Sequence, residues 1–399
     1  MFRSFARSTR QFLTAIVLLL VALVVTEIVL QVKSPPPSAT VTSRVSEDTQ
    51  ILLAPSSTTH HELLRLSSHQ LSGEAVLKTN SFGLRGHEPV QPKPESLLRI
   101  VVLGDETILS PELAAEETVP TRLQEFLAAA TQGSGTDVEV INAGVPGYCP
   151  LLSRLQLQHQ LQQLKPDIVV LHFDMNDVAD DAVYRRALKT NEGQQICVNH
   201  MLAPDRREPN SLLRLLRSSA LLRLIQQETG LAATHSSAQG FASLNDRYRW
   251  TTASRVALRL QIEHALEPIQ QLAQFAERSG FRLLVSSSPT PWQVATADDF
   301  PVLAEQMGPD VSWPLIEDIP YQILTAISAR SSVAFCNAAT KFRAFSEPAK
   351  LFQNDSPGLS RYGAALYARE IASMLVRDER FAASFSRRPV LSSRTPQRN

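Results

Sequence analysis

The stretch Ile100-Val101-Val102-Leu103-Gly104-Asp105-Glu106-Thr107 decides the fold class of this chain. Its first four residues form a continuous apolar run rich in β-branched side chains, which is typical of a strand buried on both faces of a parallel sheet. The Gly-Asp that ends the run predicts a turn that presents Glu106 at the edge of the sheet. Ligands of open α/β sheets gather at that edge, so residue 106 is the first candidate for a functional position.

Apolar strand-like segments alternate with amphipathic helical segments along the rest of the chain. This alternation predicts an α/β fold in three α/β/α layers, with a five-stranded parallel sheet, helices on both faces and right-handed crossovers. The predicted strands are Leu98–Leu103, Val138–Ile141, Asp167–Phe173, Phe281–Ser287 and Val333–Cys336, and the main predicted helices are Thr121–Ala130, Leu152–Leu164, Ala253–Glu277, Leu315–Ala329 and Tyr362–Val376.

An apolar segment near the N-terminus, Phe12–Val32, has the ~20-residue length that a transmembrane helix needs. Arg3, Arg7 and Arg10 precede it and only Lys33 follows closely, so the positive-inside rule places the N-terminus in the cytoplasm and the main domain outside it. A cleaved signal peptide is the alternative. The predicted organisation is a cytoplasmic segment 1–11, a transmembrane anchor 12–32, a juxtamembrane spacer and collar 33–96, an α/β domain 97–380 with an insertion at about 180–246, and a disordered tail 381–399.

Charge and cysteine content exclude several classes of function. The chain has 39 basic and 39 acidic residues, so its zero net charge gives no general attraction to nucleic acid. Its three cysteines, Cys149, Cys197 and Cys336, lack metal-ligand spacing, and three buried thiols are favoured over one disulfide with a free thiol. No cofactor and no metal site is predicted, and no protein partner can be named.

Polar and glycine-rich segments follow the predicted strands. Taken in order, they resemble the sequence blocks of the SGNH (GDSL-type) hydrolases, in particular the bacterial members tethered by an N-terminal membrane helix. The resemblance extends to about residue 378 and implies a flavodoxin-like α/β/α domain. The matching segments are Val102–Glu106, Val140–Tyr148, Pro166–Val170 with Asn176–Val178, and Asn354–Gly363, while Thr26–Leu30 and Thr79–Gly86 are similar to the anchor and to the segment before the first strand in that group.

The family's mechanism is acyl transfer by a serine, a histidine and an aspartate. Its oxyanion is held by a glycine amide, an asparagine side chain and the N–H of the nucleophile itself. By the resemblance, Gly147 matches the oxyanion glycine, Asn176 the oxyanion asparagine and Asp355 the aspartate. Glu106 stands at the serine position and Gly358 at the histidine position. The nucleophile and the base are therefore both missing.

The chain has no histidine after His264 that could replace the base. The sequence therefore predicts an esterase-fold protein of the cell envelope that is catalytically inactive. Family members act on acyl esters, often O-acetyl groups of envelope polysaccharides, so an acylated or carbohydrate ligand is expected. The resemblance also predicts that Glu106, Gly147, Asn176 and Asp355 converge at one edge of the sheet.

Two other functions stay open from the sequence. An active esterase or O-acetyltransferase would need a substitute mechanism, such as a Glu106 nucleophile with Asp174 or Asp355 as a partner acid at about 5 Å. A scaffold or interaction module would use the insertion at 180–246. His172 lies within a predicted strand and is expected to be a core or helix-facing residue.

The candidate site residues also have plain structural interpretations. Asp105 is expected to hold its loop through hydrogen bonds to the backbone. Gly147, which follows Pro146, suits a type II turn, and Asn176 suits a helix cap. For both residues the structural and the binding role stay open. Asp355 suits a turn, which is favoured because no histidine follows it.

Overall fold

The computed structural model describes residues 41–44, 50–65, 69–70, 76–199, 247–248, 255–307 and 318–385. The predicted anchor at 12–32, the tail beyond residue 385 and most of the predicted insertion lie outside these ranges. Within them, no helix combines the length and the hydropathy that a membrane crossing requires. The described residues other than Val41 belong to one compact unit, formed by Thr42–Leu202 and Phe241–Asn399.

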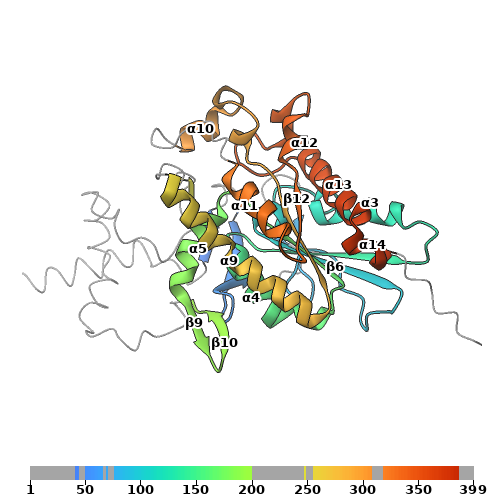
Figure 1. The fold of residues 1–399 in the computed structure, drawn as a ribbon. Coiled ribbons are helices and arrows are strands. Elements are labelled where there is room, and N and C mark those ends of the chain that lie inside the picture. Colours follow the sequence, from blue (N-terminus) through green and yellow to red (C-terminus); the bar gives the residue numbers. More distant parts are fainter. Residues whose placement is uncertain are drawn as a thin grey trace, which may run out of the picture. The chain divides into compact units, whose positions relative to one another are not determined.

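A five-stranded parallel sheet forms the centre of this unit (Figure 1). The strands follow the order β12-β11-β8-β6-β7, and every neighbouring pair is parallel. This confirms the predicted α/β class and the five-stranded sheet. The strands are β6 (Leu97–Gly104), β7 (Asp137–Gly144), β8 (Ile168–His172), β11 (Arg282–Ser287) and β12 (Ala334–Asn337).

The central strand β6 is buried along all eight residues, as its apolar run predicts. Successive side chains alternate between the two faces of the sheet. Ile100 and Val102 join one core cluster, while Val101 and Leu103 join the other. The sheet is therefore the middle of three layers.

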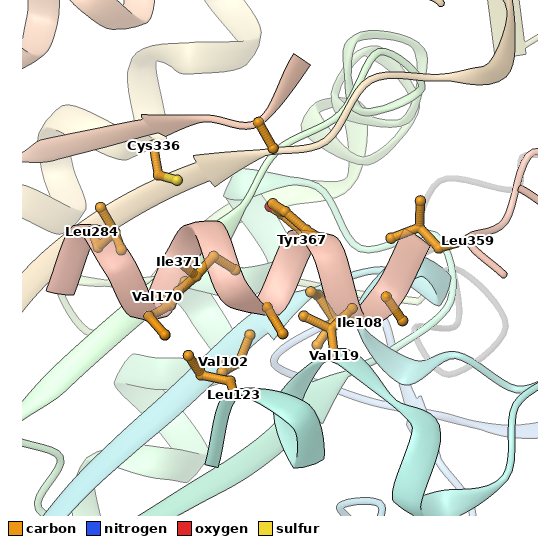
Figure 2. Packing of buried hydrophobic residues seen from close by; sticks show 14 of the residues in the cluster. Val102, Ile108, Val119, Leu123, Val170, Leu284, Cys336, Leu359, Tyr367 and Ile371 are labelled. Carbon is orange, nitrogen blue, oxygen red and sulfur yellow. The ribbon is translucent and has the colours of Figure 1, made fainter. Parts of the chain in front are cut away.

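Helices cover both faces of the sheet (Figure 1). On one face, α3 (Val119–Ala130) and α13 (Arg361–Arg377) pack against each other and against the sheet. Figure 2 shows Tyr367 and Ile371 of α13 among Val102, Val170 and Leu284 of the strands. The opposite face is covered by α4 (Pro150–Gln156), α9 (Arg255–Ser279) and α11 (Ile319–Ser328). The other α-helices of the described residues are α2 (Glu106–Leu109), α5 (Asp177–Tyr184), α10 (Pro301–Met307), α12 (Ala339–Arg343) and α14 (Glu379–Phe385).

Short strands form small sheets outside the central one. In the predicted collar, Leu53, Leu63 and Leu77 are buried in a third core cluster with Tyr148 and Leu151 of the main domain. The collar thus packs on the domain. The small sheets are β1-β2-β3 (Val41–Arg44, Gln50–Pro55 and His61–Leu63), β4-β5 (His69–Gln70 and Val76–Leu77) and, at the start of the predicted insertion, β9-β10 (Leu188–Asn191 and Gln194–Cys197). All three cysteines are free and buried, as favoured from the sequence.

Candidate functional site

The turn after β6 is fixed by Asp105, which is almost fully buried. Its carboxylate accepts a hydrogen bond from the Thr107 N–H at 2.9 Å and so caps the one-turn helix α2 that begins at Glu106. This agrees with the role expected from the sequence. Gly144 at the end of β7 lets α2 approach, because a Cβ there would lie 2.3 Å from the Leu109 nitrogen. The turn therefore presents residue 106 at the carboxyl edge of the sheet.

Glu106 is bound on both carboxylate oxygens. Its Oε2 accepts the Gly147 N–H at 2.9 Å, and its Oε1 accepts an Nη1 hydrogen of Arg247 at 2.5 Å. Gly147 has a φ of 71° in a turn closed by the Tyr148 N–H and the Val145 carbonyl, as its turn role predicts, whereas its role in binding a ligand stays a prediction. The turn glycine aims its amide at residue 106, as the resemblance implies, but the group it holds is the chain's own carboxylate.

Arg247 links Glu106 to a second carboxylate. It donates through Nη2 to Asp180 Oδ2 at 2.9 Å, and only 8% of the residue is exposed. Burial lowers the pKa of Arg247, but Asp180 and Glu106 together raise it by more, so it stays well above its ordinary value. The pKa of Asp180 is raised to about 6, mainly by burial. Arg247 lowers this pKa and the charge of Glu106 raises it. Arg247 thus bridges two carboxylates in a largely buried network.

Asn176 lies directly before α5 but does not cap it, because its side chain makes no hydrogen bond to the helix. Instead its Nδ2 donates to Asp105 Oδ2 at 3.1 Å, across the space between β8 and β6. Burial raises the pKa of Asp105 well above its ordinary value, with the charges of Glu106 and Asp174 adding to the effect and Arg247 and Asn176 opposing it. The second predicted oxyanion donor is thus at the site, and it too is engaged by the chain itself.

Asp355 is exposed, and within the described residues it makes no hydrogen bond or ion pair with Glu106, Gly147 or Asn176. Its charge acts on Glu112, whose pKa is raised to about 7, first by burial and then in smaller part by Glu106 and Asp355. A Cβ on Gly358 would lie 3.1 Å from Ser356 Oγ and 3.9 Å from Glu112 Oε2. The loop that carries both positions therefore faces Glu112.

His172 is buried and faces a helix, as the sequence analysis expects, but it also lies beside two carboxylates that the sequence did not indicate. It ends β8 with 2% of its surface exposed, and its Nε2 lies 3.6 Å from Asp174 Oδ2 and 4.0 Å from Asp105 Oδ1. Its Nδ1 lies 2.8 Å from the Tyr367 hydroxyl of α13, so the ring also faces a helix. The parallel register of β6 and β8 could have indicated that His172 lies near Asp105. Leu171 pairs with Leu103, so the residues that follow them reach the same edge of the sheet.

Two residues of the collar fix the loops of the site. The buried guanidinium of Arg85 donates to the carbonyls of Leu109, Ser110 and Leu113, at 2.5 to 2.7 Å, and so holds the chain that leaves α2. His61 Nε2 lies 2.8 Å from the Pro146 carbonyl beside Gly147. Burial lowers the pKa of His61 to about 3, so the ring is neutral and its Nε2–H donates to that carbonyl.

A cavity of about 700 Å³ lies beside the loop that carries Asp355 and Gly358. Phe345 and Tyr362 are 38% and 54% exposed there, an unusual exposure for aromatic side chains. The Arg361 guanidinium lies 5.0 Å from the centre of the Tyr362 ring. The walls also carry carboxylate, amide and hydroxyl groups, including those of Glu112, Asn354 and Ser360. The cavity thus combines aromatic surface with hydrogen-bonding groups.

No protein-family model matches this chain, and no curated protein matches it in sequence. Among solved structures, it is similar to a lipase/acylhydrolase from Enterococcus faecalis, with 14% identity over 69% of this chain and 94% of that chain and a TM-score of 0.37. It is also similar to the acetyl xylan esterase AlAXEase, with 15% identity over 69% and 98% of the two chains and a TM-score of 0.38. Values this low carry no argument about activity, which has to come from the geometry of the site.

Proposed function

We propose that this chain is a membrane-anchored protein of the cell envelope with an SGNH-hydrolase fold, that it has lost turnover, and that it binds an acylated or carbohydrate ligand. Support for the fold comes from the ordered sequence blocks and from the five-stranded parallel sheet that brings the first three of them to one edge. Support for the loss of turnover comes from the contacts of Glu106.

The observation that carries the proposal is the hydrogen bond from the Gly147 N–H to Glu106 Oε2. An oxyanion hole works when its donors point at the place where negative charge develops in the transition state. Here the side chain of Glu106 already accepts the hydrogen bond of the Gly147 amide, and Asn176 donates to Asp105. A substrate carbonyl would have to displace Glu106 from both Gly147 and Arg247 to reach the same donor.

In the part of the chain that the structure describes, no base contacts residue 106. Among the described residues, the side-chain partners of Glu106 are the Gly147 amide and Arg247, and no histidine is among them. Arg247 is a permanent cation, so it cannot accept a proton. His172 bonds to Tyr367 and faces Asp105 and Asp174. A glutamate held by an arginine and a backbone amide acts as a structural anion in this arrangement.

The cavity beside Glu112 is the place where we expect the ligand. Pockets for small molecules and sugars combine aromatic or apolar walls with a few polar groups that set orientation, and this cavity has both. It also borders the segment that would carry the aspartate and histidine of an active relative. A ligand bound there would lie where substrates of such an enzyme approach.

Ligand binding can be tested with O-acetylated envelope oligosaccharides and their de-acetylated forms, titrated into the full-length protein. Tyr362→Ala should weaken binding roughly tenfold, because a central aromatic contact contributes more than about 1 kcal/mol. The matched control is Leu260→Ala, which removes an apolar side chain of similar exposure, 61% against 54% for Tyr362, from α9. Equal affinities of the two variants, or no binding of any oligosaccharide, would remove the ligand part of the proposal.

The membrane topology can be tested with a reporter fused after residue 399. A reporter that is active only outside the cytoplasm should work in this position, because Arg3, Arg7 and Arg10 hold the N-terminus inside. Replacing these three arginines with glutamate should reduce the signal, since the charge difference across the predicted span reverses. Activity of a cytoplasm-specific reporter in the unmodified fusion would contradict the assignment.

A further inference from the structure

Three buried groups with lone pairs converge beside the site turn. The His172 Nε2, an oxygen of Asp105 and an oxygen of Asp174 all lie within 4.8 Å of one another. His172 is only 2% exposed, and its Nε2 makes no hydrogen bond within the described part of the chain. Buried polar atoms nearly always have a hydrogen-bond partner, so the bare Nε2 indicates that a bound group completes the site.

The tautomer of His172 follows from its other nitrogen. The Tyr367 hydroxyl donates its hydrogen to Ser286 Oγ at 2.8 Å, so its oxygen is left to accept a hydrogen from His172 Nδ1. Nδ1 therefore carries the proton, and a neutral His172 presents the lone pair of Nε2 to the two carboxylates. Histidine ligands of metals are commonly oriented through a hydrogen bond from the second nitrogen.

Both carboxylates are oriented by their own hydrogen bonds. Asp105 Oδ2 accepts from Asn176 Nδ2, which leaves Oδ1, already bonded to the Thr107 N–H, turned toward His172. Asp174 Oδ1 accepts from the Asn176 N–H at 3.0 Å, which leaves Oδ2 turned toward the same nitrogen. One oxygen of each carboxylate thus faces Nε2, and each of these oxygens also lies within reach of Thr107: Asp105 Oδ1 accepts the Thr107 N–H, and Asp174 Oδ2 lies 3.4 Å from the Thr107 hydroxyl.

The distances decide what can lie between these atoms. A proton shared between nitrogen and oxygen needs the two atoms about 2.7 to 3.2 Å apart. The separations of 3.6 and 4.0 Å from Nε2 are too long for that. A metal ion about 2.1 Å from each donor allows donors up to about 4.2 Å apart. Both separations from Nε2 fall within this limit, and the three donor atoms all lie within 4.8 Å of one another. The spacing therefore suits a cation better than a shared proton.

We propose that Asp105, His172 and Asp174 bind a divalent transition-metal ion, with Zn²⁺ as the best fit. The two carboxylates and the neutral imidazole together carry the charge that offsets the two positive charges of the ion. The imidazole favours zinc and its neighbours over Mg²⁺ or Ca²⁺, which prefer oxygen donors alone. The ion would tie the ends of β6 and β8 together. The proposal does not depend on the ligand proposed for the cavity.

The test uses the full-length protein, stripped with a chelator and titrated with Zn²⁺ or with Mg²⁺. We expect one Zn²⁺ per chain by elemental mass spectrometry and calorimetry, and a higher melting temperature with Zn²⁺ than with chelator. Mg²⁺ should bind far more weakly. His172→Gln and Asp174→Asn should each weaken Zn²⁺ binding on the order of 100-fold or more. Tyr367→Phe removes the partner of Nδ1 and a donor to Ser286 but leaves the three metal donors in place, so it should weaken binding by about 10- to 100-fold.

His159→Gln is the matched control, because His159 Nε2 bonds to the Gln195 carbonyl away from the cluster. It should leave Zn²⁺ affinity unchanged. Asp174→Asn keeps the oxygen that accepts from Asn176, so it decides the question if His172→Gln does not fold, as judged by circular dichroism in chelator. Absence of Zn²⁺ binding, or equal Zn²⁺ binding by the wild type and Asp174→Asn, would overturn the proposal.

Discussion

The purified full-length protein should hydrolyse small activated acyl esters no faster than its Glu106→Ala variant. Loss of the nucleophile or the base of a serine hydrolase costs about 10⁶ in kcat, and loss of both costs little more because they act as a unit. The residual ~10³–10⁴ over water in such enzymes comes from the oxyanion donors and from binding. Here the Gly147 N–H already donates to Glu106, so this residual activity should also be smaller. Chromogenic ester hydrolysis measures it directly.

Single replacements should not restore turnover. Glu106→Ser supplies a hydroxyl and frees the Gly147 amide, but it supplies no base. Adding Gly358→His places an imidazole beside Glu112 and Ser356, with the Cβ 3.9 and 3.1 Å from their oxygens, so recovery also requires this loop to shift. The double variant Glu106→Ser/Gly358→His is therefore the smallest change that could restore ester hydrolysis. Clear activity of the unmodified protein that Glu106→Ala abolishes would show that an unusual enzyme had been taken for an inactive one.

The layers of the fold could be predicted because strands that are buried on both faces have continuous apolar sequences. The run Ile100–Leu103 lies within β6, which is buried along its whole length, and the predicted strand Val138–Ile141 lies within β7. The ends of strands were harder to predict. β7 continues to Gly144 through Asn142 and Ala143, because the hydrogen bonds of the β6 ladder continue even where side chains are small or polar.

The candidate site was predicted in part. Asp105 and Glu106 were indicated by their position directly after a strand, and Gly147 and Asn176 by the resemblance to the SGNH sequence blocks. His172 was assigned to the core because it continues the buried pattern of β8, and only the pairing with β6 shows its neighbours. Arg247 could not be predicted at all. Its partners Glu106 and Asp180 lie far away in the sequence, and the segment around it has no periodicity that indicates a contact.

Arg247→Met should cause a large loss of stability, since it leaves Glu106 and Asp180 without their shared counter-ion. Removing one partner of a buried ion pair costs about 3–5 kcal/mol, because the other charge stays buried and uncompensated. The side chains of Arg247, Glu106 and Asp180 are 10%, 14% and 7% exposed, so we expect a value near the lower end of that range. Denaturant titration of the full-length protein gives the change in the free energy of unfolding.

Two comparisons show whether this loss comes from the network. Arg259→Met makes the same substitution in a pair with Glu263 that is 63% and 45% exposed, where a change of at most about 1 kcal/mol is expected. Glu106→Gln combined with Arg247→Met should cost less than the sum of the single changes, because one buried charge disappears with its partner. Strictly additive losses would mean that Arg247 does not hold Glu106 in place, which would contradict this part of the argument for an inactive site. The stability cycle therefore tests the physical basis of the inactive site without any assay of activity.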